Sequence, residues 1–198
     1  MEKIIYPLDL KFNIGTLAND FTASDAEGLT IAYVRQKMFK LKEKVVVFSD
    51  KTKTTEKYQI KADKWLDFNT SYNFTDTNGK ELGRVARKGW KSLWKAKYEL
   101  YDEQDKQDLI IQEENPWVKV FDALLGEVPV LAILSGYLFN PKYAITRPDG
   151  TIVARLSKKK SFFGRHFAID KLAEFEEGEE LRVFLGSMMM LLLERRRG

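Results

Sequence analysis

Apolar and polar residues alternate along much of this chain with the two-residue period of a β-strand that is buried on one face. The clearest examples are residues 8–14 (LDLKFNI) and 95–101 (KAKYELY). Similar short segments follow at 44–49, 56–62, 71–76, 80–88, 108–114, 142–147, 151–157 and 162–170. The dipeptides Asn78-Gly79 and Asp149-Gly150 are typical of hairpin turns, so the pattern predicts antiparallel strands.

The C-terminal segment LRVFLGSMMMLLLERRR (181–197) has a different pattern, because no residue from Val183 to Leu193 is charged. As a helix this uncharged stretch covers about 17 Å, whereas a bilayer core is ~30 Å thick, so a membrane span is disfavoured. A partner-binding tail is the second alternative. Acidic residues precede the segment and arginines end it, which complements a helix dipole. Since apolar side chains occur around the whole helix, we expect it to be enclosed by its own domain.

The remaining residues are enough for about a dozen strands, and a barrel with that many strands can hold a central helix. The sequence therefore predicts a mainly β protein with one domain over residues 1–198. We expect a closed antiparallel barrel of about 12 strands around a buried hydrophobic C-terminal helix at about 176–195.

A short helical insertion is predicted at about 115–126. Asn115 can cap the helix, Pro116 suits its first position and Gly126 can end it. The apolar stretch that continues beyond it is interrupted by charges, so we expect a lid or plug. An interfacial segment that touches a membrane is the alternative.

Three segments are weakly self-similar: 25–37, 76–88 and 147–159 each pass from a turn that ends in glycine into a strand that ends in basic residues. The glycines, at 28, 79 and 150, are too unevenly spaced for a solenoid or propeller. A hairpin duplicated within one barrel fits this spacing better.

The motifs DTNGKELGRVARKGW…YELYDE (76–103) and NPKYAITRPDGTIVARLSKKKSFFGRHFAID (140–170), followed by the apolar terminal helix, resemble the tubby C-terminal-like superfamily. The resemblance is greatest to its LURP-one-related and phospholipid scramblase branch, and it covers nearly the whole chain. It implies a barrel of about twelve strands around a hydrophobic C-terminal helix. Tubby-type members bind phosphoinositide head groups through basic residues, and scramblase-type members are linked to lipid movement and calcium. This chain has no proline-rich N-terminal region, cysteine-rich stretch or acidic calcium loop, so lipid scrambling is not the expected activity.

Charge and composition add a hint about partners. The formal net charge is +4 with a pI of about 9.0, which mildly favours anionic surfaces. Because the chain has no cysteine, disulfides, thiolate metal sites, a cysteine nucleophile and palmitoylation are all excluded. Residues 1–15 lack the apolar core of a secretion signal, so we expect a cytoplasmic protein.

Two basic clusters next to aromatic residues are the candidate sites. We predict binding of lipid or another anion by Lys158, Lys159, Lys160, Arg165, Arg87 and Lys88, with Phe162 and Phe163 as membrane contacts. The alternative is structural: a solvated hairpin with two core phenylalanines, and core tryptophans at 90 and 94 next to the second cluster.

The sequence contains no pattern that indicates catalysis. His166 is the single histidine, and no G-x-S-x-G, P-loop or G-x-G-x-x-G motif occurs. We therefore expect a non-enzymatic protein without a cofactor or a metal site. Paired-carboxylate hydrolysis has nothing specific in its favour, because Asp25, Asp76 and Asp149 suit turns.

Peripheral binding of anionic phospholipid, such as a phosphoinositide, is the function that these patterns favour. A nucleic-acid or transcription-related module is the first alternative. The second is a scaffold for protein partners or for a small apolar ligand that is held beside the central helix.

Overall fold

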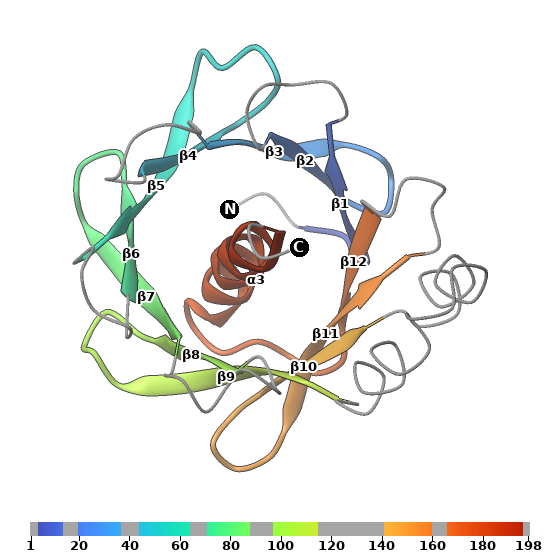
Figure 1. Cartoon of the computed structure of the whole chain (residues 1–198), viewed down its shortest axis with the longest axis vertical. Helices are drawn as coiled ribbons and strands as arrows, with labels where there is room; N and C mark the ends of the chain where they lie inside the picture. The colour runs from blue at the N-terminus through green and yellow to red at the C-terminus, as the bar shows by residue number, and fades with distance from the viewer. Residues whose placement is uncertain are drawn as a thin grey trace, which may run out of the picture.

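The structure is a computed structural model of the whole chain and describes residues 4–13, 20–36, 44–63, 71–87, 97–114, 141–159 and 166–195. Twelve antiparallel strands close into a barrel, and the helix α3 (Glu179–Arg195) lies inside it (Figure 1). The strands are β1 (Leu8–Phe12), β2 (Phe21–Ser24), β3 (Thr30–Gln36), β4 (Lys44–Phe48), β5 (Glu56–Ala62), β6 (Ser71–Asp76), β7 (Glu81–Arg87), β8 (Lys97–Tyr101), β9 (Gln107–Glu113), β10 (Lys142–Thr146), β11 (Ile152–Lys158) and β12 (His166–Lys171). The predicted mainly β barrel with a central C-terminal helix is confirmed.

Each strand pairs with its neighbours in the sequence, and β1 closes the barrel by pairing with β12 as well as β2. Alternate side chains point inward, as the period of the sequence predicted. On β1, Leu8, Leu10 and Phe12 are buried, whereas Asp9 and Lys11 lie on the outer face. The buried side chains of the strands and those of α3 form one continuous core.

The helix α3 is buried on all sides. Val183, Phe184, Leu185 and the residues from Met188 to Leu192 are at most 5% exposed. A surface helix has one apolar stripe, but this one needs the full ring of strands around it. No helix in the described part of the chain is long and apolar enough to cross a bilayer.

The helix begins at Glu179, later than the predicted 176. Gly178 has a φ of +74°, which is outside the helical region, and the amide of Arg182 donates the first helical hydrogen bond to the Gly178 carbonyl at 3.1 Å. The acidic residues correctly indicated that a helix begins near this point. Gly178, with its non-helical backbone, sets the first helical residue at Glu179.

Two glycines allow α3 to approach β7 and β8. A Cβ at Gly186 would clash with the side chain of Leu100 on β8. A Cβ at Gly83 on β7 would clash with the backbone oxygen of Tyr101 and with the side chain of Arg182 of α3, and Gly83 also has a φ of +116°. Gly83 therefore requires glycine, whereas a side chain at Gly186 would force Leu100 to move.

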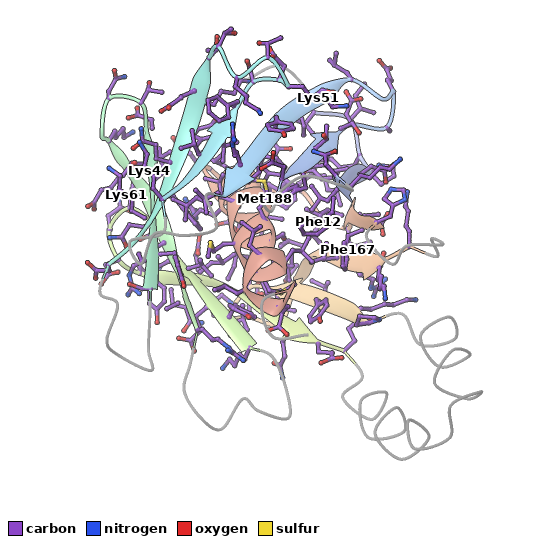
Figure 2. All side chains as sticks on the ribbon, turned by 45° about the horizontal axis from the view of Figure 1, so that its top comes forward. Phe12, Lys44, Lys51, Lys61, Phe167 and Met188 are labelled. Carbon is purple, nitrogen blue, oxygen red and sulfur yellow. The ribbon has the colours of Figure 1, made fainter. Side chains whose placement is uncertain are left out.

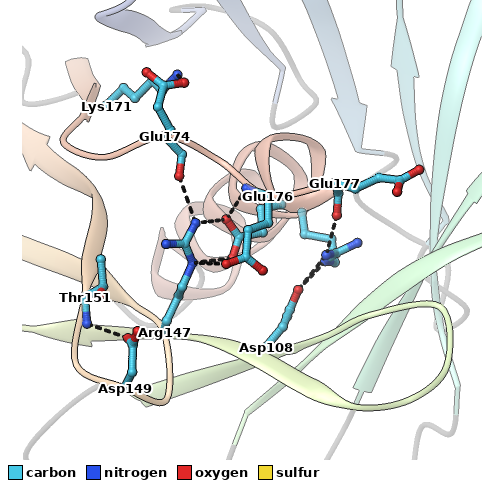
Figure 3. A network of polar contacts seen from close by, with 10 residues as sticks. Asp108, Arg147, Asp149, Thr151, Lys171, Glu174, Glu176 and Glu177 are labelled. Carbon is cyan, nitrogen blue, oxygen red and sulfur yellow. Dashed lines mark hydrogen bonds and ion pairs between the residues drawn. The ribbon is translucent and has the colours of Figure 1, made fainter.

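Two arginines hold the first turn of α3 to the wall (Figure 3). Arg147, next to β10, donates to both carboxylate oxygens of Glu179 at 2.8 and 2.7 Å and to the Glu174 carbonyl. Arg182 of α3 donates to Asp108 of β9 at 2.6 Å. Burial raises the pKa of Asp108 although the charge of Arg182 opposes that shift. The ion pairs thus connect α3 to two separate strand ends.

The last turn of α3 is held at the other end of the barrel. The Tyr98 hydroxyl of β8 donates to Glu194 at 2.5 Å. Burial, followed by the charge of Glu194, raises the pKa of Tyr98 well above its usual value. A polar contact therefore anchors α3 at each end of its apolar stretch.

The hairpin turns near the start of α3 share one geometry. Asp25, Asp76 and Asp102 each accept hydrogen bonds from the amides two and four residues later. The fourth residue of each turn has a positive φ, and in two of them it is Gly28 or Gly79. The turn at 147–150 has the same backbone hydrogen bond, from the Gly150 amide to the Arg147 carbonyl. This shared turn explains the self-similarity seen in the sequence, and it gives the turn aspartates a structural role.

Most predicted strands are present within four residues of their expected bounds, and β5 and β6 match those bounds in full. The short strand β2 was not recognised as a strand of its own, because four residues are too few to show a period. The predicted insertion at 115–126 lies outside the described residues.

We predict that Arg182→Met destabilises the protein by about 3–5 kcal/mol, because it leaves Asp108 largely buried without its partner. Chemical denaturation measures this change. Asp108→Leu in the Arg182→Met background should restore much of the loss. The control Arg155→Met breaks a more exposed pair with Glu114, and it should cost less than about 1 kcal/mol. Equal losses in the two single variants would contradict an anchoring role for Arg182.

Candidate functional site

The two ends of the barrel differ in charge. We call the end where α3 begins the acidic mouth; it includes the turn aspartates and Glu174, Glu176, Glu177, Glu179 and Glu180. We call the end where α3 finishes the basic mouth, because the basic residues at its strand ends outnumber the acidic residues Asp20, Asp63, Glu113 and Glu114 there. The basic residues are Arg35, Lys44, Lys61, Arg87, Lys97, Lys142, Lys158 and Lys159. Each described connection between strands lies at the acidic mouth, because the strands are antiparallel and consecutive.

The structure brings three of the predicted anion-binding residues to the basic mouth, but in different settings. Arg87 belongs to the inward-facing row of β7, opposite Tyr98. Its guanidinium carbon lies 5.8 Å from the centre of the Tyr98 ring, and its Nε is buried without a hydrogen-bond partner. Arg87 therefore lies near Tyr98, whose hydroxyl contacts Glu194, and not on the outer wall of the barrel.

Lys158 is the last residue of β11, and Lys159, which follows it, points to the opposite face. Lys158 pairs with Phe167 and shares the inward face of Leu156. Lys159 donates to Asp9 on the outer wall at 2.5 Å. The carboxylate of Asp9 therefore compensates much of the charge of Lys159. The sequence did not predict this ion pair. Their roles in anion binding stay predictions.

The other predicted residues, Lys88, Lys160, Phe162, Phe163 and Arg165, lie outside the described residues, as do Trp90 and Trp94. The strand ends on either side of them are described. Arg87 precedes Lys88, and Lys158 and His166 flank the segment 160–165. These three strand ends lie at the basic mouth, so both predicted clusters follow from strands that end at the same side of the molecule.

A further set of basic residues lies on the outer wall near the basic mouth. These residues were not among the sites predicted from the sequence. Lys44 of β4 is directly opposite Lys61 of β5, and both side chains are exposed. Lys61 is in turn opposite Asn73 of β6, and Arg35 is exposed on β3 opposite Val46. Figure 2 shows Lys44 and Lys61 together on one side of the barrel, whereas Lys51 lies in the turn at the other end. We call Lys44, Lys61 and Asn73 the lysine row.

The lysine row is not neutralised within the part of the chain that the structure describes, where neither lysine forms an ion pair. By contrast Arg84, which follows Asn73 in the same row on β7, donates to Asp105 at 2.6 Å and stacks on Tyr101 at 3.7 Å. Alternation placed these lysines on the outer face of their strands. Only the register between β4 and β5 shows that they are neighbours.

Metal chemistry finds no support in the described ranges, where no group of three possible metal ligands occurs. His166 lies on the outer face of β12, and its Nε2 is 3.3 Å from Asp9 Oδ1. This is the contact of a wall residue with a neighbouring strand.

Comparison with known proteins supports the fold. The family described as LURP-one-related matches residues 30–172, from the start of β3 to the end of β12. Comparison with curated proteins and with solved structures found no significant match. Because the family match covers well over half of a chain that also folds as a closed barrel around its C-terminal helix, the protein belongs to the LURP-one-related family of the tubby-like superfamily.

Proposed function

We propose that this protein is a cytoplasmic, non-enzymatic module that binds the head groups of anionic phospholipids at a membrane surface, with its basic mouth toward the lipid. The observation that supports this most is the lysine row. Two exposed lysines are directly opposite each other on neighbouring strands, and an amide side chain is next to them.

Like charges in directly opposite positions destabilise an antiparallel pair of strands. Their Cβ atoms are about 4.5–5.5 Å apart, so both ammonium groups can reach one phosphate. A phosphate between them would remove the repulsion and accept hydrogen bonds from both lysines. Asn73 adds an amide donor for a second oxygen, and Arg35 adds positive charge on β3.

The charge difference between the two mouths supports the orientation. In the sequence, the segments 37–43, 88–96 and 160–165 connect strands that end at the basic mouth, and they contain Lys37, Lys40, Lys42, Lys88, Lys91, Lys95, Lys160 and Arg165 against Glu43. The other connections between strand ends of this mouth, 13–20, 63–70 and 114–141, carry formal charges of −1, −1 and −2, so the sum over all six connections stays positive. An anionic membrane attracts the basic mouth and repels the acidic one, so the protein approaches with one end first.

Membership of the tubby-like superfamily and the aromatic residues next to Lys160 also fit lipid better than nucleic acid. Phe162 and Phe163 offer apolar groups that can enter a membrane interface. Nucleic acid presents the same phosphate chemistry, and it remains the alternative that the experiments below distinguish.

We predict that Lys44→Glu/Lys61→Glu lowers binding to phosphoinositide-containing liposomes by more than about tenfold, since each lysine near an anionic surface contributes about 1 kcal/mol and its reversal adds repulsion. Liposome sedimentation measures the loss. The control Lys51→Glu/Lys106→Glu makes the same charge change at the acidic mouth and should bind nearly as the parent does.

The parent should bind more as anionic lipid increases and less as salt increases. Equal losses in the two double variants would show that net charge alone drives binding, and would contradict a role for the lysine row. If the protein does not bind liposomes but binds oligonucleotides with a steep salt dependence, the nucleic-acid alternative replaces this proposal.

We further predict that Lys160→Glu/Arg165→Glu weakens liposome binding by a similar factor, because both residues belong to the segment that joins β11 and β12 at the basic mouth. Phe162→Ser/Phe163→Ser should weaken binding mainly at high salt, where insertion of apolar groups contributes more than charge. If neither variant differs from the parent, the segment 160–165 is not part of the contact.

A further inference from the structure

A cleft of about 520 Å³ opens at the acidic mouth, between the first turns of α3 and the strand ends around them. This size is within the range of sites for small ligands, which is about 300–1,000 Å³. Its apolar wall includes Leu181 and Phe184 of α3, Ile31 of β3 and Tyr58 of β5. The cleft therefore reaches the central helix from outside.

The entrance of the cleft is also apolar on one side. Leu29, which lines it, is 61% exposed in the turn between β2 and β3, and Ile4 lines it from the segment before β1. Leaving a large aliphatic side chain in water forfeits the stabilisation that burial gives. An aliphatic group in the cleft would cover Leu29 and extend the core of the barrel.

Charged residues at the rim of the cleft determine which charge the polar group of a ligand can carry. Glu56 and Lys57 both line the cleft, and Gln59 donates to one oxygen of Glu56 at 3.0 Å. Asp76 precedes the lining residue Thr77, and Glu180 precedes Leu181. Burial, followed by the charge of Asp76, raises the pKa of Tyr58, so the negative field reaches the wall of the cleft. Within the lining the charges of Glu56 and Lys57 offset each other, so the negative charge that complements a cation comes from Asp76, which is opposite Tyr58, and from Glu180.

We propose that this cleft binds a small amphiphile with an aliphatic body and one amine, the body packing on Leu181 and Phe184 and the ammonium lying at the Glu56 rim. The site is at the opposite mouth from the lysine row and does not depend on the proposed function. It uses apolar burial for affinity and the acidic rim for selectivity.

The test compares octylamine, octanol and octanoate with the full chain in the absence of membranes, by calorimetry and by the shift in melting temperature. The amine should bind most tightly, then the alcohol, then the carboxylate. We expect the amine to exceed the carboxylate by about tenfold or more, because the two probes differ by two unit charges at the rim.

Two variants locate the site. Thr77→Trp places a large side chain in the cleft from an exposed turn position, and it should abolish binding of all three probes. Glu56→Lys should reverse the order of amine and carboxylate. The control Glu103→Lys makes the same charge change in the β8–β9 turn of the acidic mouth and should leave the order unchanged.

Absence of binding by octylamine at millimolar concentration would overturn the proposal, as would tighter binding of octanoate by the parent. Binding that Thr77→Trp does not alter would place the ligand elsewhere and overturn it as well. Because liposomes are not used, failure here leaves lipid binding at the basic mouth unaffected, and the Thr77→Trp variant should still bind liposomes.

Discussion

The burial of one apolar helix is the constraint on which the rest of this structure depends. From Val183 to Leu192 the side chains of α3 are buried around the whole circumference, so no single sheet or helix can cover them. A ring of twelve strands encloses such a helix completely, and it leaves no edge strand exposed. The glycines at 83 and 186 allow the helix to lie close to β7 and β8. Arg147 and Arg182 hold one end of it, and Tyr98 holds the other.

The difference in charge between the two mouths follows from this architecture. Consecutive antiparallel strands place alternate connections at opposite ends, and the connections at the acidic mouth are tight turns. Aspartate is favoured there because its carboxylate accepts the amides of the turn, as Asp25, Asp76 and Asp102 do. Acidity at this mouth is thus partly a by-product of turn formation. It nevertheless separates two surfaces of different charge at opposite ends of the barrel.

The candidate site shows where reasoning from clusters in the sequence fails. Lys158 and Lys159 are consecutive, but strand alternation places them on opposite faces, and Asp9 from the far end of the chain neutralises the second. Arg87 lies on the inward face of β7. The alternation along β7 shows that Arg87 shares a face with Val85, but only the barrel shows that this face points inward. Lys44 and Lys61 are seventeen positions apart in sequence (61 − 44) and become neighbours through the register of β4 and β5.

Local patterns in the sequence determined most strands, the hairpin turns, the enclosed terminal helix and hence the barrel, because a two-residue period and an uninterrupted apolar helix each allow few arrangements. The tertiary structure alone decided which charged residues meet. A charged side chain on a strand finds its partners across neighbouring strands, and strand register and barrel closure depend on the summed packing of the whole core rather than on any local segment. For this reason the lysine row, the pairing of Lys159 with Asp9 and the cleft beside α3 became visible only in the folded barrel.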